Sequence, residues 1–334
     1  MIDPDLLVSM LELPKTDLHV HLEGTLEPEM FFRLAERNRV VLPWETPEKL
    51  HEACSFRDLS GFLAIYFKAC QVLRTEEDFY DLTRAYLERA AADGVVHTEI
   101  FLGPQTFLAQ AVSLDEIMNG IFRAMDEMRD RISSLYLGSV IRTRPESEAL
   151  ALLKQLQPWY DRIAGFGMGG AEKGNPPSRF VEYFRECKRL GFRTTVHAGE
   201  EDPAEYVREA LNILHIDRID HGYTAINDPE LMRELAEHQV PLTLCPISNL
   251  RLNVMRDPRD CPLRRFLEAG IMVTINSDDP AYFLAYETDN WRLCMDALEL
   301  SRAELMQLAK NGICASFMPE TEKRNWLAKI RLMN

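Results

Sequence analysis

The chain has 334 residues, of which 46% are hydrophobic and 27% charged, which excludes disordered, collagen-like and coiled-coil proteins. Acidic residues outnumber basic ones by 53 to 38, and the formal net charge is −15 at pH 7. Because an acidic surface repels phosphate groups, this charge argues against nucleic acid and anionic membranes as partners.

The N-terminal residues 1–10 contain two acids and no basic residue, unlike a secretory signal peptide. No apolar run reaches the roughly 18 residues that a membrane-spanning helix needs. The seven cysteines form no Cys-x-x-Cys motif, which predicts free thiols in a reducing compartment rather than a disulfide framework. We therefore expect a cytoplasmic protein.

Short apolar or β-branched runs alternate with amphipathic stretches along the chain. Such alternation predicts parallel βα units, and eight of them favour one (β/α)8 barrel domain over residues 1–334. An open doubly wound sheet is the alternative, although no Gly-x-Gly-x-x-Gly motif follows the first run. The predicted strands are residues 15–21, 94–102, 135–141, 162–168, 192–197, 217–221, 240–245 and 271–277.

A long insertion of about 70 residues separates the first predicted strand from the second. Insertions after barrel strands lie at the carboxyl ends of the strands, where barrel active sites form. We therefore predict that residues 28–92 form a helical lid or pocket wall; the alternative is a helical layer away from the chemistry. Trp44, Phe62 and Tyr66 would face either the pocket or a core. Helical patterns occur at residues 28–39, 56–73 and 76–92.

Histidines and acids stand at the ends of four predicted strands. His19 and His21 form a His-x-His pair, and residues i and i+2 of a strand point to the same face. His197, His221 and the acidic pair at 278–279 end three later strands. Because these strand ends converge on one face of a barrel, they predict a metal site, and zinc accepts such nitrogen and oxygen ligands.

Taken together, the motifs PKTDLHVHLEGTLEPE, HAGE, RIDHG, LCPISN and NSDDPAYF resemble those of the adenosine/adenine deaminase family of the amidohydrolase superfamily. The resemblance runs from about Pro14 to Ala315, with the motifs in the family's order. It implies a metal-dependent hydrolase of the (β/α)8 barrel type with one catalytic zinc per chain. The implied reaction replaces the 6-amino group of a small-molecule purine by oxygen.

The same resemblance implies a role for each site residue. Glu200 would protonate purine N1, and His221 would orient and deprotonate the attacking water. Asp279 would hold the nucleophile and hydrogen-bond purine N7, while the backbone N–H of Gly170 would contact purine N3. Ser248, in the LCPISN motif, is either a hydrogen-bond partner of a site residue or an ordinary turn residue. The zinc ligands would be His19, His21, His197 and Asp278.

Elementary chemistry supports these roles. Substitution at purine C6 needs a strong nucleophile at neutral pH, and zinc lowers the pKa of its water to roughly 7. Attack places negative charge on N1, and a carboxylic acid that protonates N1 contributes about 10²–10⁴-fold to the rate. Glu200 must then be neutral in the free site, so we expect burial to raise its pKa.

Glu23 bears on the choice of substrate. It stands in HLEGTLEPE, where adenosine deaminases usually place an aspartate against the ribose, and its extra methylene would narrow that space. With LPW, DPAEY and DDPAYF, this segment resembles the bacterial and fungal adenine deaminase branch, although GGAE at 169–172 departs from that branch's Ser-Ser-Glu. We therefore expect adenine or an N6-substituted, cytokinin-like adenine as substrate. Adenosine and aminodeoxyfutalosine are the alternatives.

Two further motifs have ordinary explanations. His97-Thr98-Glu99 matches half of the cytidine deaminase zinc signature, but the Pro-Cys-x-x-Cys half is absent. Lys173 lies in a polar loop, which predicts a solvated lysine rather than the carbamylated ligand of a two-metal site. The alternative from a different class is a catalytically inactive barrel used as a binding protein. The sequence leaves the oligomeric state open, a homo-oligomer included.

Overall fold

Eight parallel strands stand in sequence order in the computed structural model, which describes residues 4–333, and each strand pairs with its neighbour in the chain. A bridge between Val20 and Asp278 joins the first strand to the segment after the last. This arrangement confirms the predicted (β/α)8 barrel; the ends of the predicted domain, residues 1–3 and 334, lie outside the described residues. The strands are β1 Lys15–His21, β2 Val95–Leu102, β3 Ser133–Ile141, β4 Ile163–Gly169, β5 Arg193–Ala198, β6 Arg218–His221, β7 Leu242–Leu244 and β8 Val273–Ile275.

The last two strands are shorter than the predicted runs at 240–245 and 271–277. Pro241 has no N–H to donate to the ladder, and Pro246 occupies the first position of the next helix, so only three residues between them pair as β7. After β8, the backbone N–H of Asn276 still donates to the carbonyl of Leu244 at 2.9 Å, and its side chain accepts the N–H of Leu18 at 2.9 Å. Proline residues therefore limit β7, and Asn276 links the end of β8 to β1.

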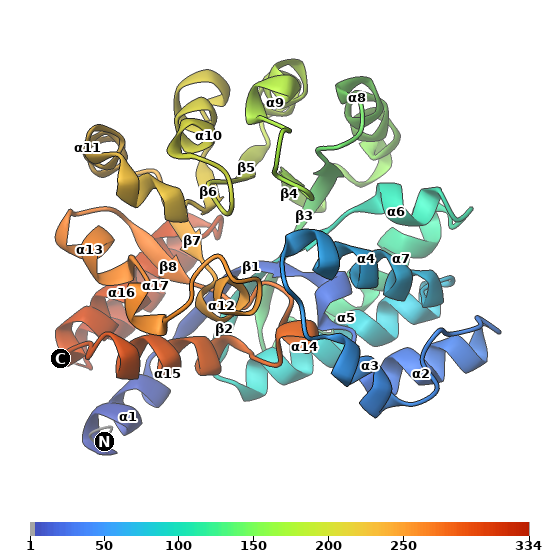
Figure 1. The fold of residues 1–334 in the computed structure, drawn as a ribbon, viewed down its shortest axis with the longest axis horizontal. Helices are drawn as coiled ribbons and strands as arrows, with labels where there is room; N and C mark the ends of the chain where they lie inside the picture. Colours follow the sequence, from blue (N-terminus) through green and yellow to red (C-terminus); the bar gives the residue numbers. More distant parts are fainter. Residues whose placement is uncertain (1–3, 334) are drawn as a thin grey trace.

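Helices surround the strands on the outside of the barrel (Figure 1). Their starts follow local signals: Thr75–Asp78 and Ser113–Glu116 form capping boxes before α5 and α7. No helix of the described part of the chain is long and apolar enough to cross a membrane. The helices are α1 Pro4–Glu12, α2 Pro28–Arg37, α3 Pro47–Ala53, α4 Leu59–Ala69, α5 Glu76–Ala92, α6 Pro104–Leu108, α7 Leu114–Met128, α8 Glu146–Gln155, α9 Val181–Arg189, α10 Ala204–Glu209, α11 Pro229–His238, α12 Pro246–Arg251, α13 Leu263–Glu268, α14 Pro280–Phe283, α15 Glu287–Ala297, α16 Arg302–Ala315 and α17 Glu320–Arg331.

The segment between β1 and β2 carries four helices, α2 to α5, which lie on one side of the barrel (Figure 1). Helix α4 packs through Phe62 against Phe283 of α14, with ring centroids 4.9 Å apart. Trp44 instead packs edge-to-face on Phe31 at 5.9 Å, within the insertion itself. The aromatic side chains of this segment thus divide between the rim of the barrel and a local core.

Candidate active site

A cavity opens to solvent where the carboxyl ends of the strands converge. Residues from the ends of seven of the eight strands, or from just after them, reach it, and α4 supplies a largely apolar wall. Helix α4 belongs to the insertion, so the insertion does border the cavity; its movement as a lid stays a prediction. The lining residues are His21, Glu23, Leu59, Phe62, Leu63, Tyr66, Phe67, Gly103, Thr106, Ser139, Val140, Ile141, Gly169, Gly170, His197, Glu200, His221, Leu252, Asp278 and Asp279.

Three histidines and one aspartate meet at the bottom of this cavity. The Nε2 atom of His197 lies 3.0 Å from Nε2 of His19 and 3.1 Å from Nε2 of His21. Oδ1 of Asp278 lies 3.6 Å and 3.5 Å from the same two Nε2 atoms. The structure therefore brings together all four residues that the sequence predicts as metal ligands, around one point.

The chemistry of these donors fits a metal ion. Burial, followed by the neighbouring histidines, lowers the pKa of His19 well below its usual value and that of His21 to about 4. Both imidazoles are consequently neutral at pH 7, which is the form that binds metals. Burial alone would raise the pKa of Asp278, but His221, His21 and hydrogen bonds from Ser248 and Asp279 together lower it, so its carboxylate stays charged.

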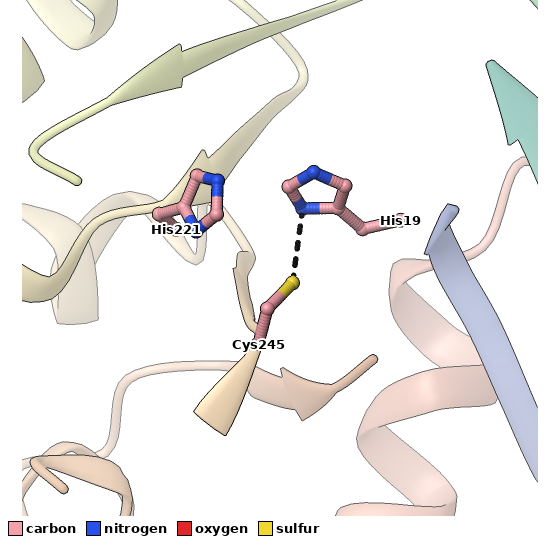
Figure 2. A group of neighbouring side chains, drawn as sticks. All are labelled: His19, His221 and Cys245. Carbon is pink, nitrogen blue, oxygen red and sulfur yellow. Dashed lines mark hydrogen bonds between the residues drawn. The ribbon is translucent and has the colours of Figure 1, made fainter. Parts of the chain in front are cut away.

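In His19 and His197, the Nδ1 atom faces other side chains of the protein. Nδ1 of His19 lies 3.1 Å from Oγ1 of Thr243, which donates to Oδ1 of Asp220 at 3.1 Å. Nδ1 of His197 lies 3.3 Å from Oδ2 of the same Asp220. Figure 2 shows Sγ of Cys245 directed at Nδ1 of His19, at 3.5 Å and beside His221. Partners on Nδ1 leave the Nε2 atoms for a shared ligand.

Asp220 is a site residue that the sequence reasoning missed. It is fully buried on β6, directly before His221, and also accepts a hydrogen bond from Thr195 at 2.6 Å. The signal was present, because an acidic residue inside a short buried strand such as RIDH needs a partner. The partner lies on other strands, so the residues near Asp220 in the chain did not reveal it.

Two acids next to the histidine cluster have perturbed pKa values. Glu200 is buried, and burial, with Asp278 adding to it, raises its pKa well above the usual value. Its Oε2 lies 3.6 Å from Nε2 of His221. The pKa of Asp279 is likewise raised, by burial and then by the charge of Asp278. Both shifts favour the protonated carboxyl, the form that can donate a hydrogen bond into the cavity.

The backbone around the acidic pair is unusual. His221 and Asp278 both have φ of 66°, a region that residues other than glycine adopt rarely and mostly at functional sites. Gly24 allows β1 and the β8 end to approach closely, since a Cβ there would lie 2.0 Å from Oδ1 of Asp279. The glycine of the HLEG segment is therefore required by packing against the acidic pair.

Glu23 projects into the cavity from the 3-10 turn after β1. Its Oε1 accepts the backbone N–H of Gly103 at 3.0 Å, and its Oε2 is buried without a hydrogen-bond partner among the described residues. Burial raises the pKa of Glu23 to about 7, although the Gly103 N–H opposes the shift. Glu23 thus presents its carboxyl, with the side chain of Tyr66 beside it, to a molecule bound in the cavity.

The remaining predicted residues lie as follows. Gly170 lines the cavity with φ of 95°, a left-handed conformation that favours glycine. Ser248 is buried in the first turn of α12.

The His97-Thr98-Glu99 motif lies on β2. Nε2 of His97 is 3.2 Å from Oε1 of Glu99, and Oε2 of Glu99 pairs with Nη1 of buried Arg218 at 2.6 Å. Lys173 is exposed. The structure thus gives Glu99 an internal ion pair.

Comparisons with known proteins agree on one family. A family model described as adenosine deaminase matches residues 14–333. An adenine deaminase of Rhodopseudomonas palustris is 50% identical over 320 residues, which cover 95% of this chain and 93% of that protein. The crystal structure of an adenine deaminase from Arthrobacter aurescens matches with a TM-score of 0.93 and 44% identity, over 96% of this chain and 98% of that one. An amidohydrolase of Burkholderia ambifaria with bound zinc matches at 28% identity and a TM-score of 0.90, over 100% and 94%.

Proposed function

Because the chain belongs to the adenosine deaminase family, we propose that it is an adenine deaminase, which converts adenine and water to hypoxanthine and ammonia. The observation that carries the proposal is the convergence of three histidines, Asp278, Glu200 and Asp279 at one end of one cavity. Relatives at 50% and 44% identity are adenine deaminases, which supports the choice of purine.

We propose that one zinc ion binds at the histidine cluster, held by His19, His21, His197 and Asp278. Neutral imidazole nitrogens and one carboxylate oxygen form the ligand set of many zinc sites, and a similar structure contains zinc. When bound, zinc supplies a nucleophile at neutral pH, because it lowers the pKa of water to roughly 7.

Glu200 and His221 carry the proton transfers in this proposal. The protonated carboxyl of Glu200 donates its proton to purine N1, which gains electron density as C6 is attacked. His221, 3.6 Å from Glu200, accepts the proton of the attacking water and returns it to the departing amino group. The proton from Glu200 stays on N1 of hypoxanthine, and the proton held by His221 leaves with ammonia. As the C6 hydroxyl of the intermediate becomes the carbonyl of hypoxanthine, its proton passes to Glu200, so both residues regain their starting forms and the protons balance.

Two further contacts orient the ring. Asp279, protonated because its pKa is raised, donates a hydrogen bond to the lone pair of purine N7. Oδ1 of Asp279 is buried without a partner among the described residues, which leaves it free for the ligand. The N–H of Gly170 contacts N3 from the other side of the ring. Together these groups place C6 over the histidine cluster.

We assign Glu23 to the choice of the free base over the nucleoside. In adenine, the N9–H donates a hydrogen bond to the carboxylate of Glu23, whereas in adenosine N9 carries the ribose and has no hydrogen to donate. A site with a buried acceptor disfavours an analogue that lacks the donor, because the acceptor is then left unpaired.

A substrate panel tests the proposal. We expect kcat/KM for adenine to exceed that for adenosine by at least about 100-fold, with N6-isopentenyladenine assayed in parallel. Ultraviolet absorbance measures each rate. In Glu23→Asp the shorter side chain should move the preference toward adenosine. If the wild type prefers adenosine, the proposal that adenine is the substrate is wrong. If metal-replete protein is inert on every aminopurine, the proposal that the protein is a deaminase is wrong.

Asp220 provides a test of the metal site. Asp220→Asn should lower zinc affinity roughly 10–100-fold, because the amide replaces the acceptor that faces His197 and Thr243. Competition with a chromogenic chelator measures the affinity, and excess zinc should restore much of the turnover. Asp217→Asn is the matched control. Asp217 directly precedes the same strand, and its carboxylate accepts hydrogen bonds from Arg193 and Thr194 instead of facing the histidines. Equal zinc affinity in Asp220→Asn and the wild type would show that Asp220 does not orient the ligands.

A further inference from the structure

Glu172 is a fully buried acid in the loop after β4 that makes an unusual set of hydrogen bonds. Its carboxylate accepts the backbone N–H groups of four consecutive residues. Oε1 accepts from Gly199 at 2.6 Å, and Oε2 accepts from Glu200, Glu201 and Asp202 at 3.0, 2.8 and 3.1 Å. Residues 199–202 lie in the connection between β5 and α10, so one side chain accepts the hydrogen bonds of all four backbone N–H groups at the start of that loop.

These bonds fix the direction of the Glu200 side chain. The four N–H groups point at Glu172, while the side chain of Glu200 lines the cavity and reaches within 3.6 Å of His221. Gly199 has φ of 70°, and a Cβ there would lie 2.5 Å from Val207. The loop is therefore held in one conformation, with its backbone turned to Glu172 and its acid turned to the cavity.

Buried Arg142 supports the same arrangement. Its Nη1 donates to the carbonyl of His197 at 2.7 Å and its Nε to the carbonyl of Asn175 at 3.0 Å. The N–H of Asn175 in turn donates to the carbonyl of Glu172 at 2.9 Å. The loops after β4 and β5 are thus bound to each other on the side away from the cavity.

We propose that Glu172 is a positioning residue for Glu200. Through its four backbone hydrogen bonds it holds residues 199–202 so that the carboxyl of Glu200 meets purine N1, and it does not contact the substrate itself. The inference rests on the proposed function, since it assumes that Glu200 is the acid of the reaction. Misplacement of a reacting group by about 1 Å can cost about 100-fold in rate.

A double-mutant cycle with zinc-replete protein tests the proposal. Glu172→Gln puts an NH2 group against backbone N–H donors, so we expect kcat for adenine to fall at least about tenfold at unchanged zinc content. In a Glu200→Gln background the same change should cost less than about twofold, since no acid remains to be positioned. Equal losses in both backgrounds, or no loss in either, would overturn the proposal.

Hydrogen exchange keeps this test apart from the proposed function. Amide exchange at residues 199–202 should be faster in Glu172→Gln, and unchanged protection there would also overturn the proposal. If the wild type does not deaminate adenine, the proposed function fails while the exchange result still reports on the loop. Glu205→Gln, at an exposed acid on α10, is the matched control and should change neither readout. If Glu172→Gln does not fold, Glu172→Asp takes its place and should lower kcat in the same direction.

Discussion

Replacing Glu200 by glutamine should lower kcat for adenine by about 10²–10⁴-fold while zinc stays bound. Glutamine has nearly the same shape and donates a hydrogen bond, but it has no proton to transfer to N1. The effect is large because burial holds Glu200 in its protonated form. Steady-state turnover, with metal analysis of the same sample, measures both quantities.

The pH profile gives this substitution a second readout. The acid form of Glu200 is the active one, so wild-type kcat/KM, which reports the free enzyme, should be present below the pKa of Glu200 in the folded protein and be lost as pH rises through it. Glu200→Gln should lack that decline, because its amide does not titrate. Glu201→Gln changes the neighbouring exposed acid and should keep the wild-type profile. Near-normal turnover of Glu200→Gln would show that another group protonates the purine.

The sequence alone was enough to predict the eight strands and the groups that meet beyond their carboxyl ends, although the exact ends of β7 and β8 differ from the prediction. β-Branched runs mark the eight strands, and a histidine or acid in the last positions of β1, β5 and β6 has to face the same end of the barrel. The fold and the family are confirmed. Because barrel topology brings strand ends together, residues far apart in the chain, such as His19 and His197, could be placed side by side.

The supporting acids could not be predicted in the same way. Glu172 and its partner Gly199 are 27 residues apart, and a single acid in a polar loop looks like a solvated one in the sequence. Asp220 depends on Thr195 and Thr243, which belong to neighbouring strands. Even where an acid in a buried strand signals that a partner is needed, as at Asp220, the identity of the partner is set by the register between strands and by loop conformation, which neighbouring residues in the chain do not reveal.

The aromatic residues of α4 show a related limit. Phe62 and Tyr66 are one helical turn apart, a spacing equally typical of a core and of a pocket wall. In the structure both apply, because each side chain is buried and also lines the cavity. Burial and contact with a ligand are therefore not exclusive for a helix that covers the mouth of a barrel.

Substitutions of the adjacent acids Asp278 and Asp279 should have different effects: one should abolish zinc binding and the other only catalysis. Asp278→Ala should lower the zinc affinity by more than the roughly 10–100-fold expected when a residue that only orients a ligand is replaced. Turnover should be lost together with the zinc. The pKa of Asp278 is lowered and its Oδ1 lies within 3.6 Å of two ligand nitrogens, whereas the pKa of Asp279 is raised by burial and by the charge of Asp278. Asp279→Ala should therefore keep zinc and lose turnover.

The backbone conformation at Asp278 makes a second substitution necessary at this position. Its φ of 66° is unfavourable for alanine, so zinc loss in Asp278→Ala could reflect a shifted backbone rather than a missing ligand. Asparagine tolerates this conformation, yet its neutral amide oxygen is a weaker zinc ligand than a carboxylate. Asp278→Asn should therefore also release zinc to a chelator, at unchanged thermal stability of the metal-free protein. Full zinc occupancy in both Asp278 variants, or zinc loss in Asp279→Ala, would reverse the assignment of the two acids.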